Sequence, residues 1–290
     1  MKKNSNRRAE NEYSPIVWTS IKLLLILYWL SRIVIIYLQY HSTPLPQGIF
    51  TFFSFSYAQI PWIKYLFISV AIILSIMYFL EINMRVTTLL LFIFSVFSFS
   101  FEESNGVLNI YSLLSFLFFA QFAAYVLPFF SERLRGEEYR FEFSVQAISA
   151  AYTLSALSKI SVSGPNWIYS GKFMALQILK SFQYKYVTNG DWSAVQQGQE
   201  MAIYLIQNPA VTTFLLSAAL VLELFALVAV LNVKLRFWYG LSLLCMHIAI
   251  WQIMNINLFS ISFLMALFFI FPPLINRIIG IIRRQAMIYQ

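Results

Sequence analysis

The sequence predicts an all-α fold, a polytopic membrane helix bundle of about eight transmembrane helices. Of the 290 residues, 60% are hydrophobic and only 11% are charged, and the mean hydropathy is +0.70. Soluble domains carry about 25% charged residues. Several apolar runs also come close to the roughly 20 residues that a helix needs to cross a bilayer. Together these observations exclude the class of soluble domains.

Eight apolar runs are separated by short charged or proline-containing joints, and each is predicted to be one span. In chain order the predicted spans are 16–38, 62–80, 86–101, 107–130, 143–160, 209–231, 237–253 and 258–275. Pro15 precedes the first span at a position where proline is tolerated in a helix. The third predicted span is short for a full crossing.

The segment 161–208 is the longest stretch without a predicted span. Aromatic residues, including Trp167 and Trp192, alternate there with three lysines. This composition is typical of helices that lie in the membrane interface. The sequence therefore predicts an outer cap of short interfacial helices between spans five and six. The loop 41–61, rich in proline and aromatic residues, is also expected in the interface.

Two charged segments are predicted to lie in water. Glu102 and Glu103 are adjacent carboxylates at the end of a predicted span with no histidine nearby, which is typical of a solvated turn. The linker 131–142, which contains Arg140, alternates in charge and is expected to be a cytoplasmic loop.

The basic residues predict the orientation of the chain. With both termini inside, thirteen of the 20 Lys and Arg residues lie in cytoplasmic segments and four lie outside. This bias follows the positive-inside rule. The chain is therefore predicted to be a multi-pass protein of the cell membrane, with a membrane domain at 15–280 and cytoplasmic tails at 1–14 and 281–290. No basic face with interleaved aromatic residues occurs, so a nucleic-acid partner is not predicted.

The sequence lacks the motifs of several common kinds of enzyme. There is no phosphate-binding loop, no HExxH motif and no GxSxG motif, which argues against nucleotide-driven work, zinc proteolysis and serine-hydrolase chemistry. The single cysteine, Cys245, excludes an intrachain disulfide and a CxxC metal site. No metal site and no particular oligomeric state are indicated.

Polar residues inside the spans are the candidate catalytic groups. Lys159 lies at the outer end of its span, whereas Glu223 lies about nine residues from the inner end of its own, so at about 1.5 Å per residue they differ in depth by more than one turn. An ion pair between these two is not expected. His247 lies within about 2 Å of the depth of Glu223 by the same rise, so a contact near the midplane is predicted.

An ionised carboxylate alone in hydrocarbon is unfavourable by several kcal/mol, so three states of the Glu223 side chain are considered. The carboxyl group is protonated, is paired with His247, or faces a wet cavity. A contact with His247 is either a hydrogen bond that locks two helices or a dyad that handles protons.

A second cluster is predicted in the outer half of the spans, and its members are amide or basic: Arg32, Lys159, Gln252, Asn255 and Asn257. A basic, amide-lined pocket suits an anionic or carbonyl-bearing ligand. The alternative is that the long cationic side chains extend to the outer interface.

Two stretches carry a resemblance to a known family. In 156–174, ALSKISVSGPNWIYSGKFM, Lys159 is followed by Trp167 and Gly171, which resembles a segment of the vitamin K-dependent gamma-carboxylase membrane domain. The stretch 246–261, MHIAIWQIMNINLFSI, is similar to a later span of the same superfamily. Together they resemble the bacterial HTTM (horizontally transferred transmembrane) proteins, over roughly the carboxy-terminal half of the chain.

The resemblance implies a helix bundle with a centre that opens to the extracytoplasmic side, in which Lys159 matches a catalytic base. A lysine acts as a base only when its amine is neutral, which desolvation favours. By the same match, Trp167 and Gly171 are candidate ligand-binding residues. Gln252 stands where the family has a histidine, and an amide cannot exchange protons near neutral pH. The resemblance therefore implies the scaffold rather than vitamin K-dependent carboxylation.

Three functions from different classes remain. The first is an HTTM enzyme or enzyme subunit that acts on a secreted peptide or a lipid-soluble substrate, with Lys159 as base and a quinone-like or lipid molecule as cofactor. The second is a non-catalytic binding or immunity-type partner of a secreted peptide or small protein. The third is a proton-coupled transporter that uses Glu223 and His247. Membrane lipids are expected partners in each case.

Overall fold

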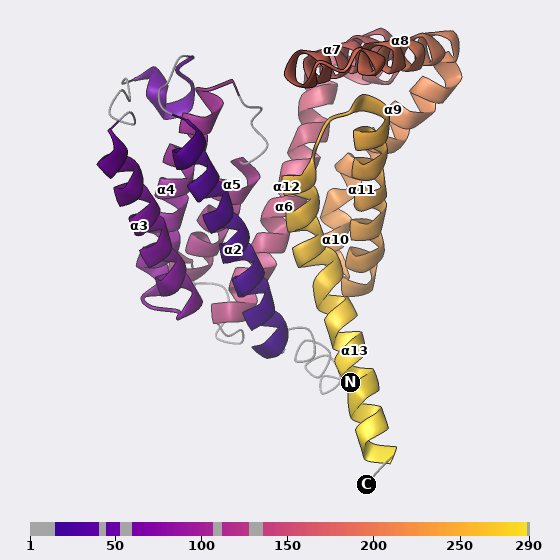
Figure 1. Ribbon diagram of the computed structural model, residues 1–290. Helices are drawn as coiled ribbons and strands as arrows, with labels where there is room; N and C mark the ends of the chain where they lie inside the picture. The colour runs from indigo at the N-terminus through magenta and orange to yellow at the C-terminus, as the bar shows by residue number, and fades with distance from the viewer. Residues whose placement is uncertain (1–14, 41–44, 53–59, 107–111, 128–135, 289–290) are drawn as a thin grey trace. The chain divides into compact units, whose positions relative to one another are not determined.

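The computed structural model describes residues 15–40, 45–52, 60–106, 112–127 and 136–288, and every regular element in these ranges is helical (Figure 1). The all-α class is confirmed. Within these described ranges, six helices are long and apolar enough to cross a membrane: Pro15–Gln39, Pro61–Phe79, Met84–Glu103, Pro209–Leu231, Lys234–Met254 and Phe259–Ile282. This number fits a multi-pass membrane protein.

The fourth and fifth predicted spans correspond to two further helices. α5 (Ser112–Val126) is apolar but short, and the remainder of the predicted span 107–130, apart from residue 127, lies outside the described residues. α6 (Gly136–Ser163) is 28 residues long. It begins well before the predicted span 143–160, because the polar residues of the predicted linker form its first turns.

Two predicted segments fall wholly or partly outside the described residues. These are the polar tail 1–14 and most of the proline-rich loop 41–61, within which the structure describes a short 3-10 turn, η1 (Gly48–Thr51). The linker residues 131–135 also lie outside. At the other end, residues 281–288 of the predicted tail 281–290 continue a helix, α13 (Phe271–Ile288), and 289–290 lie outside the described residues.

The chain divides into two compact units, and each is described by itself. Unit 1 consists of Met1–Ile148 and Phe263–Gln290, and unit 2 consists of Ser149–Ser262. α6 begins in unit 1 and ends in unit 2. The run of α12 (Phe259–Met265), the π-helical turn η6 (Ala266–Ile270) and α13 passes from unit 2 back to unit 1.

In unit 1, α2 (Pro15–Gln39) packs against α3 (Pro61–Phe79), and α4 (Met84–Glu103) packs against α5. Aromatic rings fill the space between these helices. The indole of Trp29 is fully buried and donates a 2.7 Å hydrogen bond to Ser95, and the Tyr37 hydroxyl lies 3.1 Å from that of Ser98. Small hydroxyl residues let apolar helices approach closely and satisfy the polar tips of aromatic side chains.

The prediction of a solvated turn at Glu102 was wrong. α4 continues through Glu103, and Glu102 is only 2% exposed. Its carboxylate pairs with the guanidinium of Arg32 on α2 at 2.5 Å. A cation from another helix compensates the buried carboxylate, and two adjacent acidic residues give no sign of such a partner.

The prediction that Arg140 lies in a water-exposed loop was also wrong. Arg140 belongs to α6 and is 0% exposed. Its guanidinium carbon lies 4.4 Å from the ring centroid of Trp18. An aromatic face attracts a guanidinium, so a helix from a distant part of the sequence supplies the environment that the linker itself lacks.

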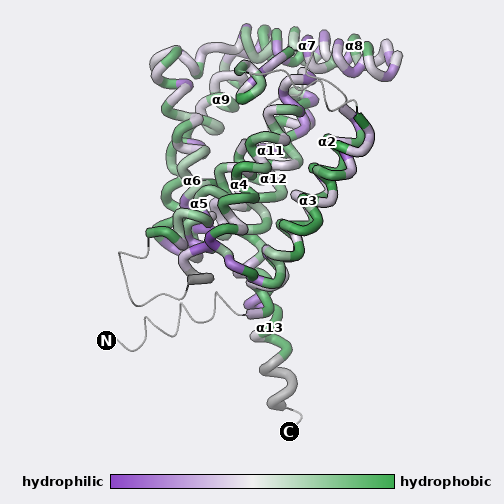
Figure 2. The backbone as a smooth tube through the Cα atoms, turned by 90° about the vertical axis from the view of Figure 1, so that its left-hand side faces the viewer, coloured by the Kyte–Doolittle hydropathy of each residue, from purple (hydrophilic) through white to green (hydrophobic). Residues whose placement is uncertain are grey.

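Unit 2 contains a helical hairpin, α7 (Gly171–Asn189) and α8 (Trp192–Gln207), preceded by the 3-10 turn η4 (Gly164–Tyr169). Figures 1 and 2 both show α7 and α8 running crosswise to α9 (Pro209–Leu224) and α11 (Val233–Met254). Figure 2 also shows hydrophilic residues interspersed along the hairpin. Helices therefore occupy most of 161–208, as predicted, although α7 is 19 residues long and not short.

The hairpin turn has clear local causes. Gly190 ends α7 with a φ of +71°, a conformation that glycine adopts without strain. Asp191 then caps α8 by accepting a 3.0 Å hydrogen bond from the backbone of Ser193. The hydrogen bond from the Ser193 hydroxyl is the main reason that the pKa of Asp191 lies below its usual value.

The hairpin is held to the rest of unit 2 by packing and by hydrogen bonds. Its apolar core consists of Met174, Ile178, Phe182, Ala194 and Leu205, with side chains of α9 and α11 against it. The Ser181 hydroxyl donates to the carbonyl of Met254 in α11. The Thr212 hydroxyl of α9 donates to the carbonyl of Leu205 at 2.8 Å. Between α9 and α11 lie a 3-10 turn, η5 (Phe225–Leu227), and a single turn, α10 (Val228–Leu231).

We predict that Gly198→Ala destabilises the hairpin. A Cβ atom at position 198 would lie 2.6 Å from Cβ of Phe182, and such overpacking costs about 1–3 kcal/mol. Thermal unfolding in lipid nanodiscs should show a lower midpoint for this variant. The control is Gly280→Ala in α13, where a new Cβ has no heavy atom within 4 Å and should not lower the midpoint. Equal midpoints for wild type and Gly198→Ala would contradict the packing.

Candidate functional site

Lys159 and Glu223 form an ion pair inside unit 2. The Lys159 ammonium contacts Oε2 of Glu223, and the two side chains are 28% and 10% exposed. The Ser155 hydroxyl donates to the same carboxylate oxygen at 3.3 Å. The expectation that these residues lie too far apart in depth was therefore wrong.

The direction of the side chains explains the error. In a helix each Cα–Cβ bond tilts toward the amino terminus. α6 leads up to η4 and α7, whereas α9 starts from α8 and runs the opposite way (Figure 1). The side chains of Lys159 and Glu223 therefore lean toward each other. Each side chain also extends over a good part of a helical turn, which the rise per residue of the backbone ignores.

His247 hydrogen-bonds to other partners than predicted. It is 4% exposed. Its Nε2 atom lies 3.0 Å from the Tyr152 hydroxyl and its Nδ1 atom lies 2.9 Å from the Ser262 hydroxyl. The carboxylate of Glu223 instead takes the cation of Lys159, because opposite charges attract more strongly than a carboxylate and a neutral imidazole in a medium of low dielectric.

Two tyrosines, Tyr152 and Tyr239, lie within electrostatic range of Glu223. The Tyr239 hydroxyl is buried and has no hydrogen-bond partner among the residues that the structure describes. We call this set the lysine cluster, and its members are Tyr152, Ser155, Lys159, Glu223, Tyr239, His247 and Ser262.

The spacing of the lysine cluster along its helices explains why its members meet. Tyr152, Ser155 and Lys159 stand three and four residues apart and share one face of α6. Tyr239 and His247 stand eight residues apart, which is close to two turns of α11. The sequence analysis missed Tyr152, Ser155 and Tyr239. Polar residues at helical spacing from Lys159 and His247 could have been found in the sequence.

Of the two residues Trp167 and Gly171, only Trp167 lies beside the cluster. The Lys159 ammonium lies 5.1 Å from the ring centroid of Trp167 in η4, within range of a cation–π interaction. Gly171 begins α7 and faces Thr212 of α9, whose Cγ2 atom would lie 3.0 Å from a Cβ atom there. Trp167 therefore contacts the cluster, while Gly171 permits close helix packing.

The other four predicted ligand-binding residues make no described contact with the lysine cluster. They are Arg32, Gln252, Asn255 and Asn257. Asn255 ends α11 in the left-handed conformation, with a φ of +51°. Asn257 accepts a 2.9 Å hydrogen bond from the backbone of Phe259, and Gln252 is exposed. Arg32 belongs to unit 1 and pairs with Glu102. The two asparagines cap helix ends, and this accounts for their position without a ligand.

The lysine cluster contains side chains that can donate or accept protons. Among the described residues, no group of three His, Cys, Asp or Glu side chains could hold a metal ion. The cluster instead joins an amine, a carboxylate, an imidazole and two phenols. Transfer of a proton from the Lys159 ammonium to the Glu223 carboxylate would leave two neutral groups.

Comparison of the chain with protein-family models, with curated proteins and with solved structures finds no match in any of the three.

We predict a strong coupling between the two members of the ion pair. Lys159→Met leaves Glu223 without its cation and should cost about 2 kcal/mol, below the value for a fully buried pair because Lys159 is partly exposed. Glu223→Gln should also destabilise the protein. The double variant should lose less unfolding free energy than the sum of the losses in the two single variants. Denaturant unfolding in nanodiscs measures this cycle.

Lys172→Met is the matched control, because Lys172 is an exposed lysine of α7, and it should change stability little. Losses from Lys159→Met and Glu223→Gln that simply add would contradict the pair.

Proposed function

We propose that this chain is an eight-span protein of the cell membrane, with α5 and α6 crossing the bilayer besides the six apolar helices. Both termini are cytoplasmic, and α7 and α8 form an interfacial cap on the outer face. The bias of Lys and Arg supports this orientation. Exposed aromatic side chains on the hairpin, among them Phe173, Tyr184 and Trp192, suit the membrane interface.

We propose further that the protein is an enzyme or enzyme subunit of the HTTM type. It acts at the extracytoplasmic face on a secreted peptide or a lipid-soluble, quinone-like substrate, with Lys159 as the base. The observation that carries this proposal is the convergence of Lys159, Glu223 and the Tyr152–His247 pair in one cluster. The resemblance of 156–174 and 246–261 to the carboxylase superfamily supports the same assignment for Lys159.

In this proposal, Lys159 becomes a neutral amine by passing its proton to Glu223. An apolar substrate that excludes water from the cluster favours the neutral state, in which the proton resides on Glu223. The Lys159 amine then accepts a proton from an acidic position of the substrate, such as the hydroxyl of a hydroquinone. Trp167 covers the amine from one side, and Ser155 orients the carboxylate.

Turnover of a model hydroquinone tests this function. Menadiol in air is oxidised to the quinone while oxygen is reduced to hydrogen peroxide, and deprotonation of the hydroxyl accelerates this reaction. Wild-type protein in nanodiscs should accelerate quinone formation over empty nanodiscs. Lys159→Met should lower the protein-dependent rate about a hundredfold, since a general base contributes at least that factor. The rate follows from the absorbance of the quinone.

Lys172→Met should keep the wild-type rate. Equal protein-dependent rates in wild type and Lys159→Met would contradict the role of Lys159. A wild type that does not accelerate the reaction would contradict a quinone-like substrate.

A second candidate function is a non-catalytic binding or immunity-type partner of a secreted peptide. Exposed apolar side chains on α7, notably Phe173 and Val187 at 74% and 78%, favour it, because large exposed apolar residues mark interaction surfaces. Under this function, Phe173→Ser with Val187→Ser abolishes peptide binding, whereas Lys159→Met leaves it intact.

A further inference from the structure

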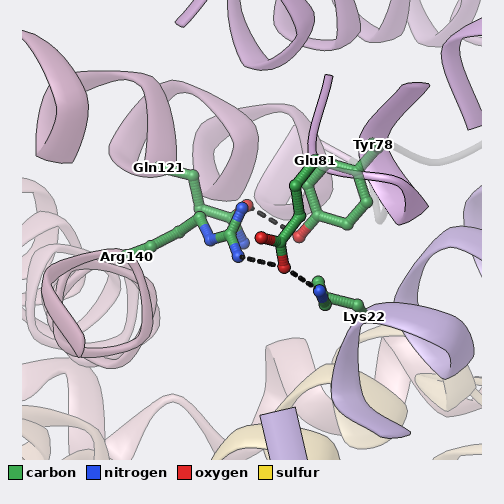
Figure 3. Close-up of polar contacts among 5 residues, drawn as sticks. All are labelled: Lys22, Tyr78, Glu81, Gln121 and Arg140. Carbon is green, nitrogen blue, oxygen red and sulfur yellow. Dashed lines mark hydrogen bonds and ion pairs between the residues drawn. The ribbon is translucent and has the colours of Figure 1, made fainter. Parts of the chain in front are cut away.

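A buried arginine lies at one end of unit 1, where α2 and α6 begin and α3 and α5 end. Arg140 is 0% exposed, although arginine is almost never fully buried unless it is paired. Figure 3 shows its guanidinium directed at Glu81, with Lys22 approaching the same carboxylate from another side. These residues belong to unit 1 and share no member with the lysine cluster of unit 2, so the inference does not rest on the proposed function.

A network of hydrogen bonds fixes the helix that carries Arg140. The Tyr78 hydroxyl donates to Oε1 of Gln121 at 2.8 Å, as Figure 3 shows. The amide nitrogen of Gln121 donates to the Ser144 hydroxyl at 3.1 Å, and that hydroxyl donates to the Arg140 carbonyl at 2.7 Å. The backbone of Arg140 is therefore held in place by side chains of two other helices and of its own.

Aromatic rings surround the guanidinium without satisfying its donors. The Arg140 Cζ atom lies 4.4 Å from the ring centroid of Trp18, 5.6 Å from that of Tyr125 and 5.7 Å from that of Tyr78. Cation–π interactions stabilise the positive charge, but they leave the planar fork of N–H groups available for acceptors.

Four buried nitrogen atoms at this place are donors without an acceptor. Nε, Nη1 and Nη2 of Arg140 and Nε1 of Trp18 have no hydrogen-bond partner among the described residues. Buried donors are satisfied in the great majority of cases. An unsatisfied group of this size, composed of donors alone, indicates an acceptor-rich ligand.

The local charge points to an anion. Lys22 and Arg140 share one oxygen of Glu81, with Lys22 in contact and Nη2 of Arg140 at 3.9 Å, beyond hydrogen-bond distance. Among the described residues, these two cations therefore share one carboxylate. Glu81 has a φ of +60°, an unfavourable conformation for a residue with a side chain, and its side chain is 38% exposed, so it can turn toward water.

We propose that Trp18, Lys22 and Arg140 form a site for a phosphate-type anion, either the headgroup of an anionic lipid or free phosphate. The guanidinium offers two parallel N–H groups to two oxygens of the anion. The Trp18 indole donates to a third oxygen, and Lys22 compensates the charge. The amino-terminal ends of α2 and α6 add favourable dipoles. Glu81 competes with the anion for Arg140 and turns outward when the anion binds.

Lipid binding measured by native mass spectrometry tests the site. The protein in zwitterionic nanodiscs is titrated with phosphatidylglycerol, or with phosphatidylcholine of the same acyl chains as the reference probe. Wild type should retain phosphatidylglycerol preferentially. Arg140→Met should weaken this binding about tenfold to a hundredfold, the effect of losing hydrogen bonds from a charged group. Arg85→Met is the control, because Arg85 is an exposed arginine of α4 next to Glu81, and it should bind as wild type does.

Two milder variants separate an anion site from a structural cluster. Trp18→Phe keeps the ring and removes only the indole donor, so binding should weaken about three- to tenfold. Glu81→Gln removes the competing carboxylate and should tighten binding. If the cluster were only structural, neither variant would change lipid affinity, and this result would overturn the proposal. Equal retention of the two lipids by wild type, together with no Arg140-dependent binding of inorganic phosphate, would overturn it as well.

Inorganic phosphate distinguishes the two sources of the anion. If added phosphate displaces phosphatidylglycerol from wild type but not from nanodiscs without protein, the site accepts a soluble anion. If it does not displace the lipid, the acyl chains contribute and the ligand is a lipid headgroup. Both results support the phosphate chemistry of the site, provided that Arg140→Met binds neither probe.

Discussion

A charge in hydrocarbon needs a counter-charge, and the packing of the helices depends on this constraint. Desolvation of a single ion is unfavourable by several kcal/mol, and an opposite charge from another helix compensates it. The described residues contain three such groupings: Lys22 and Arg140 with Glu81, Arg32 with Glu102, and Lys159 with Glu223. Each grouping joins helices that are far apart in sequence. Charge pairing therefore specifies which helices meet in a chain whose apolar surfaces are all similar.

α6 carries one paired or buried cation near each of its ends. Its sequence is too polar for the hydropathy of a typical span, and it is not among the six helices selected by length and composition. Arg140 and Lys159 stand 19 residues apart on it, about 28 Å at the rise of an α-helix. This distance approaches the thickness of the hydrocarbon core, about 30 Å. Arg140 and Lys159 therefore stand almost as far apart along α6 as a hydrocarbon core is thick, and the small residues between them permit close helix contacts.

The sequence predicted the features that depend on local composition. Apolar runs and interfacial aromatic residues located the helices, including the short ones within 161–208, because these features are properties of one segment. The errors concerned partners. Glu102 and Arg140 were assigned to water, since Arg32 and Trp18 come from a helix about 70 and 120 residues away in the chain. Depth arithmetic separated Lys159 from Glu223 because it used backbone positions and ignored side-chain direction.

The central claim is that Lys159 and Glu223 are in contact within the membrane domain. Solid-state NMR in lipid bilayers measures this contact directly, through the dipolar coupling between ¹⁵Nζ of lysine and ¹³Cδ of glutamate in labelled protein. The account predicts a coupling that corresponds to a separation within about 4 Å and that is absent when Glu223 is replaced by glutamine. A spectrum in which this replacement removes no coupling would show that Lys159 extends away from Glu223, and it would contradict both the ion pair and the role of Lys159 as a base.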